Sequence, residues 1–354
     1  MRTILGVLGL IAATCVNTHV FACGGGYGTA VTIKPSQSIG VVYHAGQESY
    51  IFRPHFCGAA TEFGLILPVP ATLTENPTLA SATLFDELEA LAAPTVEEVE
   101  VCAEHSFGMG GSAKGADMAV GATRNDGVYV VNSGTVGQFQ WELLKADSTQ
   151  SFTQWLDTNH FAYPSGATAA FDHYVQAGWY FVAFRVATGS NAPPSGYQLC
   201  GDFGPISLSF QTTKPTVPAR IATANDPYAS FLWRVFAISN SEQTIASASS
   251  LNPTLTFAGP LNTADLQSSP AVASVTNAGD WLTAFNVSFT GYYTDDIAIA
   301  QASTNTAFRE HQYNYKEVNC GVFGCTIDRS ARTVPAVFTL AMVAGLMLVA
   351  VRRR

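Results

Sequence analysis

Cysteine is the residue type whose number and spacing suit chemistry best in this chain. Seven cysteines occur in 354 residues, and Cys15 lies in an apolar N-terminal stretch that we expect to be removed. The other six are Cys23, Cys57, Cys102, Cys200, Cys320 and Cys325. An even number of cysteines in an exported protein predicts up to three disulfides, among fifteen possible pairings.

Cys320 and Cys325 flank the segment Gly-Val-Phe-Gly, so a disulfide between them would close a short loop. The alternative is a metal site that includes His311. Structural zinc sites use a second close pair of cysteines or closely spaced histidines, and the sequence has neither pattern. We therefore favour disulfides, leave their pairing open, and predict neither a metal site nor a cofactor.

Histidine and carboxylate patterns do not predict a catalytic site. No pair of histidines forms H-E-x-x-H or H-x-H, and Gly110–Gly115 misses the G-x-S-x-G pattern by one residue. Glu97, Glu98 and Glu100 alternate with apolar residues, which is typical of a half-solvated strand. They could serve glycoside hydrolysis only if the fold brought a distant acid near them. The adjacent Asp295 and Asp296 lack the D-x-D-x-D spacing of a calcium loop, so we expect a solvated turn.

Two further histidines, His160 and His173, flank the central helices that the sequence predicts. We expect each to be a half-buried packing residue rather than a ligand. No residue is therefore assigned a catalytic, cofactor-binding or metal-binding role from the sequence.

Residues 1–22 have the pattern of a secretory signal peptide. Arg2 supplies the positive charge, residues 4–16 form an apolar run too short to span a bilayer, and Ala22 provides the small residue before the cleavage site. The alternative is lipoprotein processing at Cys23, which the bulky Phe21 disfavours. We expect the mature chain to begin at Cys23.

Val334 to Val351 form an uncharged run of eighteen residues, followed by Arg352, Arg353 and Arg354. A helix of this length covers roughly 27 Å, enough for the hydrocarbon core of a bilayer. Arginines at one end of such a helix stay on the cytoplasmic side. We therefore predict a single transmembrane helix at 334–351, a cytoplasmic tail at 352–354, and an ectodomain at 23–332 outside the cytoplasm.

The charge of the predicted ectodomain limits its partners. Four of the 17 basic residues lie in the two terminal segments, so 13 basic residues face all 26 acidic ones, a difference of −13. An acidic surface disfavours nucleic acid and anionic lipid surfaces as ligands. The membrane, through the terminal helix, and other envelope or surface proteins remain as predicted partners.

The order of secondary structure predicts an α+β fold with mainly antiparallel sheets and a few short helices. Helices are expected after Thr83, which has capping-box spacing to Asp86, after Ser148, and after Pro164 with an end at Gly178. Residues 106–126 are expected to form a surface insertion. The ectodomain is either one unit or two subdomains with a break near residues 190–215. Strands are expected at 29–33, 39–44, 50–56, 63–67, 96–101, 128–131, 138–144, 179–186, 206–210, 231–238, 254–257 and 282–289.

The stretch 152–186 contains W-L-x-x-N, a proline and Y-V-x-x-G-x-x-F-V-A in this order, and it resembles the DUF2330 family of bacterial exported proteins. Residues 63–70, 84–88 and 218–221 and the segment 294–297 support the resemblance, which spans about residues 23–300. It implies a fold and export, and no biochemical activity. Where the family usually continues W-L-x-x-N with Gly-Tyr, this chain has His160-Phe161, which removes an expected turn glycine.

The C-terminal tail is similar to the tripartite sorting signals of Gram-negative bacteria, in particular the myxobacterial type, in which the helix is removed after delivery to the cell surface. A plain single-pass anchor is the alternative. The expected function is that of an envelope-anchored, non-enzymatic binding or structural module. An extracytoplasmic hydrolase with dispersed catalytic residues is the alternative.

Overall fold

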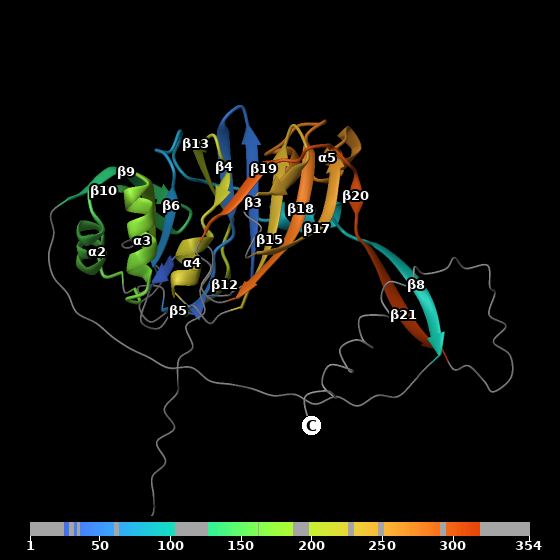
Figure 1. The fold of residues 1–354 in the computed structure, drawn as a ribbon, viewed down its shortest axis with the longest axis horizontal. Helices are drawn as coiled ribbons and strands as arrows, with labels where there is room; N and C mark the ends of the chain where they lie inside the picture. Colours follow the sequence, from blue (N-terminus) through green and yellow to red (C-terminus); the bar gives the residue numbers. More distant parts are fainter. Residues whose placement is uncertain are drawn as a thin grey trace, which may run out of the picture. The chain divides into compact units, whose positions relative to one another are not determined.

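The computed structural model describes residues 25–27, 32–33, 36–59, 64–102, 127–161, 163–186, 198–225, 230–246, 251–290 and 295–318. The chain divides into two units, of which the larger comprises residues 1–95 and 111–312 and the smaller residues 96–110 and 313–354. The described part of the smaller unit contains most of β8 (Thr95–Cys102) and β21 (His311–Val318), which pair with each other (Figure 1). Most of the further description concerns the larger unit.

An eight-stranded sheet is the largest element of this unit, with the order β20-β17-β18-β15-β3-β4-β13-β7 (Figure 1). Its β15–β3 pair is parallel, and its other neighbours are antiparallel. The β3–β4 hairpin turns at Ala45 and Gly46, whose φ angles of 50° and 84° suit a two-residue turn with positive φ at both positions. The strands are β3 (Ser36–His44), β4 (Gln47–Phe52), β7 (Thr78–Leu79), β13 (Ile206–Gln211), β15 (Ser230–Ser239), β17 (Asn252–Pro260), β18 (Trp281–Thr290) and β20 (Phe308–Arg309).

A five-stranded antiparallel sheet has the order β1-β6-β11-β10-β9. Helices α2 (Thr149–Thr158) and α3 (Ala167–Gln176) pack on it. Phe152 of α2 stacks on Phe181 of β11 at 4.0 Å between ring centroids, and Tyr174 of α3 meets the same ring edge-on at 6.3 Å. Ser148 caps α2 by accepting a hydrogen bond from the Ser151 backbone N–H. The strands are β1 (Gly25–Tyr27), β6 (Gly64–Val69), β9 (Val128–Val136), β10 (Phe139–Ala146) and β11 (Tyr180–Val186).

Two three-stranded sheets complete the strand pairing, with the orders β12-β5-β2 and β14-β19-β16. Their strands are β2 (Thr32–Ile33), β5 (His55–Ala59), β12 (Gln198–Asp202), β14 (Thr216–Val217), β16 (Gln243–Ile245) and β19 (Ile297–Gln301). The remaining helices are α1 (Leu84–Leu91), α4 (Ala219–Asn225), α5 (Thr263–Ser268) and α6 (Pro270–Ala273).

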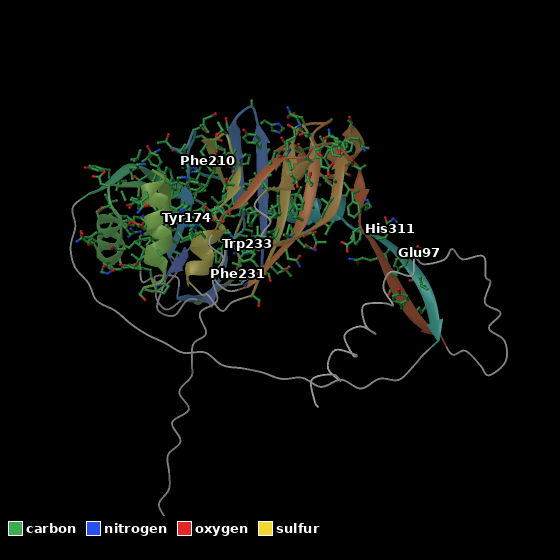
Figure 2. All side chains as sticks on the ribbon, in the orientation of Figure 1. Glu97, Tyr174, Phe210, Phe231, Trp233 and His311 are labelled. Carbon is green, nitrogen blue, oxygen red and sulfur yellow. The ribbon has the colours of Figure 1, made fainter. Side chains whose placement is uncertain are left out.

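The two faces of the eight-stranded sheet carry separate apolar cores. One face presents Phe210, Phe231 and Trp233, which belong to the largest core cluster (Figure 2). The other face presents Phe236 and Ile238 to a cluster that includes the buried side of α1. Successive strand residues point to opposite faces, so the alternation along β15 separates the two cores.

The predicted fold class is confirmed, since the described chain consists mostly of antiparallel sheets with a few short helices. The expected helices correspond to α1, α2 and α3, while the short helices α4, α5 and α6 were not predicted. The capping expectation for α1 is wrong in detail, because the Thr83 hydroxyl donates to the Glu87 side chain at 2.9 Å and makes no cap bond.

The end of α2 shows why the family pattern has a glycine at the position that His160 occupies in this chain. His160 has φ 61°, a left-handed conformation that glycine adopts without steric cost. The Phe161 backbone N–H bonds the Leu156 carbonyl at 2.9 Å, which closes the helix. His160 is exposed, so the expectation of a half-buried packing role is wrong there, whereas His173 is half-buried. The turn therefore forms without a glycine, with His160 in a strained left-handed conformation.

No helix among the described residues is both long enough and apolar enough to cross a membrane. The predicted signal peptide, the insertion at 106–126, the run Val334–Val351 and the arginines 352–354 all lie outside the described residues.

Candidate functional site

Helix α1 covers only part of one face of the eight-stranded sheet. Along β15, Phe236 and Ile238 are buried beneath the helices, whereas Arg234 is half-buried and Leu232 is exposed on the same face. The neighbouring strand β3 also becomes polar here, because its parallel register sets Ser38 beside Arg234 and Ser36 beside Leu232. The apolar face therefore becomes polar where the helix ends.

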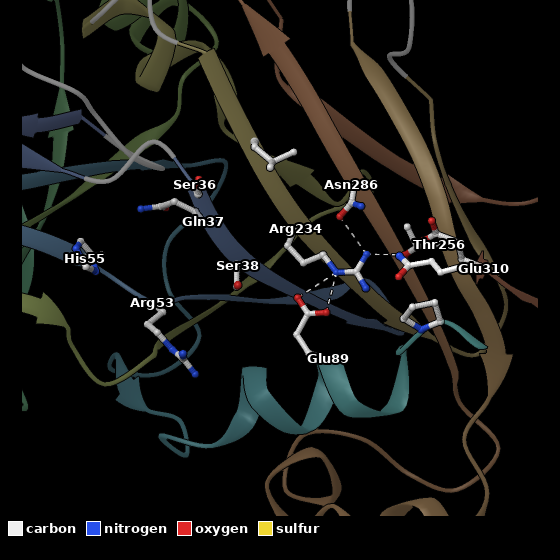
Figure 3. Close-up of a pocket in the computed structure, with 13 residues that line it drawn as sticks. Ser36, Gln37, Ser38, Arg53, His55, Glu89, Arg234, Thr256, Asn286 and Glu310 are labelled. Carbon is white, nitrogen blue, oxygen red and sulfur yellow. Dashed lines mark hydrogen bonds and ion pairs between the residues drawn. The ribbon is translucent and has the colours of Figure 1, made fainter. Parts of the chain in front are cut away.

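This polar surface is hollowed into a groove with a cavity volume of about 480 Å³ (Figure 3). Strands β3, β15, β17 and β18 supply its floor, and the α1 residue Glu89 lies above them. The lining residues are Ser36, Gln37, Ser38, Arg53, His55, Glu89, Pro94, Leu232, Arg234, Thr256, Asn286, Glu310 and Gln312.

Arg234 is the centre of the hydrogen-bond network in the groove (Figure 3). Its Nε donates to both carboxylate oxygens of Glu89 at 3.1 Å, and its Nη1 donates to Asn286 Oδ1 at 3.2 Å and to the Thr256 hydroxyl. The guanidinium also lies 5.0 Å from the ring centroid of Phe236. These contacts fix the side chain, which is 15% exposed, and join helix α1 to three strands.

The position of Thr256 depends on a β-bulge in β17. The register between β17 and β18 shifts between Leu255 and Phe257, so Thr256 is the extra residue. Its hydroxyl donates to the Ala284 carbonyl at 3.0 Å and accepts from Arg234. The bulge thus directs a polar side chain into the groove.

Arg53 forms a similar ion pair with α1, nearer the start of the helix. Its Nη2 donates to the Ala82 carbonyl at 3.0 Å, its Nη1 lies 3.4 Å from Asp86 Oδ1, and its guanidinium lies 5.2 Å from the Phe85 ring centroid. Both groove arginines are therefore paired with carboxylates of the helix. The groove offers hydroxyl, amide and paired ionic groups, which suit a polar ligand without a large net charge.

The groove geometry argues against acid–base catalysis by its best-placed carboxylate. A general acid or base must direct its proton-carrying atom toward a ligand. Both oxygens of Glu89 accept from Arg234, so this carboxylate is already committed to an ion pair. Within the described part of the chain, no group of three or more His, Cys, Asp or Glu side chains could hold a metal ion.

A histidine–aspartate pair lies elsewhere in the unit. His44 Nδ1 lies 2.6 Å from Asn240 Oδ1, and His44 Nε2 lies 3.4 Å from Asp280 Oδ2. Asp280 also accepts from the Thr276 hydroxyl at 2.7 Å. In a nucleophile–histidine–acid triad one ring nitrogen must face the nucleophile. Both ring nitrogens of His44 have other neighbours, so this pair joins the end of β3 to Asp280, which directly precedes β18.

Glu48 and Tyr174 are fully buried groups with perturbed pKa values. Burial raises the pKa of Glu48 well above its usual range, although its Oε2 accepts from the Thr216 backbone N–H at 3.2 Å, a bond that opposes the shift. Burial also raises the pKa of Tyr174, whose hydroxyl donates to Asp296 at 2.7 Å. Neither group lines the groove.

Asp296 links helix α3 to α4. It accepts from Tyr174 and from the backbone N–H of Arg220 at 3.0 Å, while burial raises its pKa. Its neighbour Asp295 pairs with the Arg220 side chain at 3.0 Å. The expectation of a merely solvated turn is therefore wrong for Asp296, which has a structural role, and holds for exposed Asp295.

The structure describes the backbone of three of the six candidate disulfide cysteines. Cys57 of β5 lies directly opposite Cys200 of β12, and Cys102 ends β8. Cys23, Cys320 and Cys325 lie outside the described residues. Glu97 and Glu98 are exposed on β8, and His311 is exposed on β21; Glu97 and His311 are labelled in Figure 2.

The groove residues were missed by sequence reasoning, because Arg234, Glu89 and Asn286 belong to no local motif. The only sequence signal is the helical spacing of Asp86 and Glu89 together with isolated arginines elsewhere in the chain. This signal does not show which arginine pairs with which carboxylate.

Comparison with protein families identifies the chain. The family model DUF2330, described as an uncharacterised protein conserved in bacteria, matches residues 18–300. The chain belongs to the DUF2330 family. No curated protein matches this DUF2330 protein. Among solved structures, the crystal structure of baculovirus P35 is similar at 8% identity and a TM-score of 0.38, over 78% of this chain and 99% of that one. This likeness is too weak to indicate a shared fold or function.

Proposed function

We propose that this chain is an exported protein of the bacterial envelope that binds a polar segment of another envelope protein in the groove above the eight-stranded sheet. The single observation that supports binding is the groove itself. It is a cavity of about 480 Å³ on one face of the sheet, and ion pairs hold its arginines in place. Binding sites place a few fixed polar groups in a concave surface.

The chemistry of the lining favours a protein ligand over a glycan. Sugar rings commonly stack on aromatic side chains, and the lining residues that the structure describes include no Phe, Tyr or Trp. Arginine, glutamine and asparagine groups exchange hydrogen bonds readily with the backbone and polar side chains of a peptide. The exposed Leu232 adds an apolar contact within the polar lining.

The pairing of Glu89, Arg53 and Arg234 favours binding without catalysis. Glu89 is bonded to Arg234 through both oxygens, and Arg53 contacts the Asp86 side chain and the Ala82 carbonyl. An extracytoplasmic hydrolase is the competing function, and Glu310, the other carboxylate in the lining, would have to act as its acid.

The proposed location rests on the sequence. The pattern of residues 1–22 supports export, and the run Val334–Val351 followed by three arginines supports an anchor with the ectodomain outside the cytoplasm. Residues 320–354 also support the second route, in which a sorting tail is removed at the cell surface. Membership of DUF2330 is compatible with both routes.

Site-specific photo-crosslinking in intact cells tests the proposed binding. A benzophenone amino acid replaces Leu232 in the groove, and the matched control replaces Leu79 of β7. Both leucines are 53% exposed, so they give the probe equal access to solvent. We expect one envelope protein to be crosslinked from position 232 and not from position 79.

The Ser38→Trp substitution provides the second half of the test, because an indole at this position fills the groove floor beside Arg234. We expect it to abolish the crosslink and to weaken binding of the crosslinked segment, made as a peptide, by roughly tenfold or more. The substitution Thr135→Trp on exposed β9 serves as control. Equal crosslinking from both leucines, a polysaccharide adduct, or cleavage of the captured partner by the purified chain would refute the proposal.

A further inference from the structure

Cys57 and Cys200 are brought together by strand pairing although 143 positions separate them in the sequence. Strands β5 and β12 are antiparallel neighbours, and their register sets Cys57 directly opposite Cys200 (strands labelled in Figure 1). On its other side β5 pairs with β2, where Thr32 lies opposite Cys57. Cys57 therefore occupies the central strand of this small sheet.

The register of this pair is held by the neighbouring part of the fold. Strand β4 continues into β5, and β12 continues into β13, so the same two chain segments also pair as β4 and β13. In that ladder Phe52 lies opposite Ile206, and both side chains are buried. The Phe203 N–H bonds the Pro54 carbonyl at 2.8 Å between the two ladders.

If β5 and β12 paired one residue out of register, the few residues between this ladder and the β4–β13 ladder would have to absorb the shift. In the β4–β13 ladder such a slip would turn the buried side chains to the opposite face. The bond at Pro54 and the buried pair at Phe52 thus oppose any register that would separate the two cysteines.

Directly opposed residues of antiparallel strands have Cα atoms about 4.5 or 5.5 Å apart, depending on whether the pair is hydrogen-bonded. Disulfides join residues whose Cα atoms are roughly 4.4–6.8 Å apart. Both kinds of opposed pair therefore fall within the range of a disulfide.

We propose that Cys57 and Cys200 form a disulfide across β5 and β12. Three of the fifteen complete pairings of six cysteines contain this bond, and the backbone register favours it among the cysteines that the structure describes. The inference is independent of the proposed binding function, because it requires only export into an oxidising compartment.

The bond forms by exchange with a disulfide-bonded protein oxidant of that compartment. The thiolate of one cysteine attacks a sulfur of the oxidant's disulfide, and a mixed disulfide results. The thiolate of the second cysteine then displaces the oxidant's sulfur, so that a Cys57–Cys200 bond replaces the mixed one. In total, two electrons and two protons pass from the cysteine pair to the oxidant, which leaves as a dithiol.

Peptide mapping of the full-length chain tests the bond. Cells are treated with iodoacetamide before extraction, so that free thiols are alkylated and cannot exchange. Trypsin together with a Glu-specific protease releases residues 49–62, with Cys57 as their only cysteine, and residues 186–220, with Cys200 as theirs. We expect mass spectrometry without reductant to find these two peptides linked, and to find them separate after reduction.

Substitutions provide the second measurement. Cys57→Ser, Cys200→Ser and the double variant should lower the thermal midpoint equally, by roughly 5–15 °C, and reductant should have no further effect on them. The control Cys102→Ser should leave the link between the two peptides intact. If the variants fail to fold, the map of the unsubstituted chain still decides. Iodoacetamide on both cysteines before reduction, or a link from either to another cysteine, would overturn the proposal.

Discussion

Glu48 provides a test of how the fold sets the protonation of a buried group. Its side chain is 0% exposed on β4, and its one backbone hydrogen bond comes from Thr216. Burial raises its pKa well above the ordinary value, so the folded protein holds a proton at pH values where the unfolded chain has released it. Glutamine at this position has the same shape and does not titrate.

The sign of the effect follows from proton linkage. Below the ordinary pKa both states are protonated, and Glu48 contributes nothing that depends on pH. Between the ordinary and the raised pKa the folded state binds one more proton than the unfolded state, so the free energy of unfolding falls as pH rises. One proton corresponds to about 1.4 kcal/mol per pH unit. Above the raised pKa the loss is complete and the slope from this group disappears.

Glu48→Gln should therefore remove this pH dependence of the unfolding free energy and also add a constant penalty. The amide oxygen of glutamine can accept the Thr216 N–H, while its buried NH₂ group introduces a penalty of about 1–3 kcal/mol that does not change with pH. The difference in unfolding free energy, variant minus unsubstituted chain, should rise by about 1.4 kcal/mol for each pH unit from about pH 5 upward, until the raised pKa is passed.

Urea unfolding of the full-length chain at pH 4 to 8 measures this difference. Tryptophan fluorescence is a suitable probe, because all five tryptophans lie in the larger unit. Glu75→Gln is the matched control, since Glu75 is exposed. Parallel pH profiles for Glu48→Gln and the unsubstituted chain would refute the assignment of a buried, protonated carboxyl group.

Substitutions at three further positions test the packing around α2 and α3. His160→Gly should raise the free energy of unfolding by about 1 kcal/mol, because it relieves the left-handed strain at φ 61°, and His160→Ala should give no gain in the same urea assay. Phe152→Ala should lower it by about 3–5 kcal/mol, since this fully buried ring stacks on Phe181. Tyr174→Phe should lower it by about 1–3 kcal/mol, because Asp296 loses its hydroxyl donor; an unchanged thermal midpoint would count against that bond.

Local patterns predicted the parts of the fold that depend on near neighbours. The apolar spacing after Ser148, and Gly178 with its φ of 74°, correctly placed the start of α2 and the end of α3. Short helices were missed, although Asn262 and Asp265 form a capping box at α5 that could have been recognised. Most strands were located, both where buried and less buried residues alternate, as in β10, and where a short apolar run is buried throughout, as in β6.

What the sequence by itself determined is the fold class, the family, the expected ends of the main helices and the even set of six cysteines that follow the predicted signal peptide. Strand order is not encoded locally, and only the tertiary structure decided which strands meet. The groove exists because distant strands place Arg234 and Asn286 beside one another and because α1 brings Glu89 above them. For the same reason, the opposition of Cys57 and Cys200 follows from long-range register, which residue spacing along the chain does not contain.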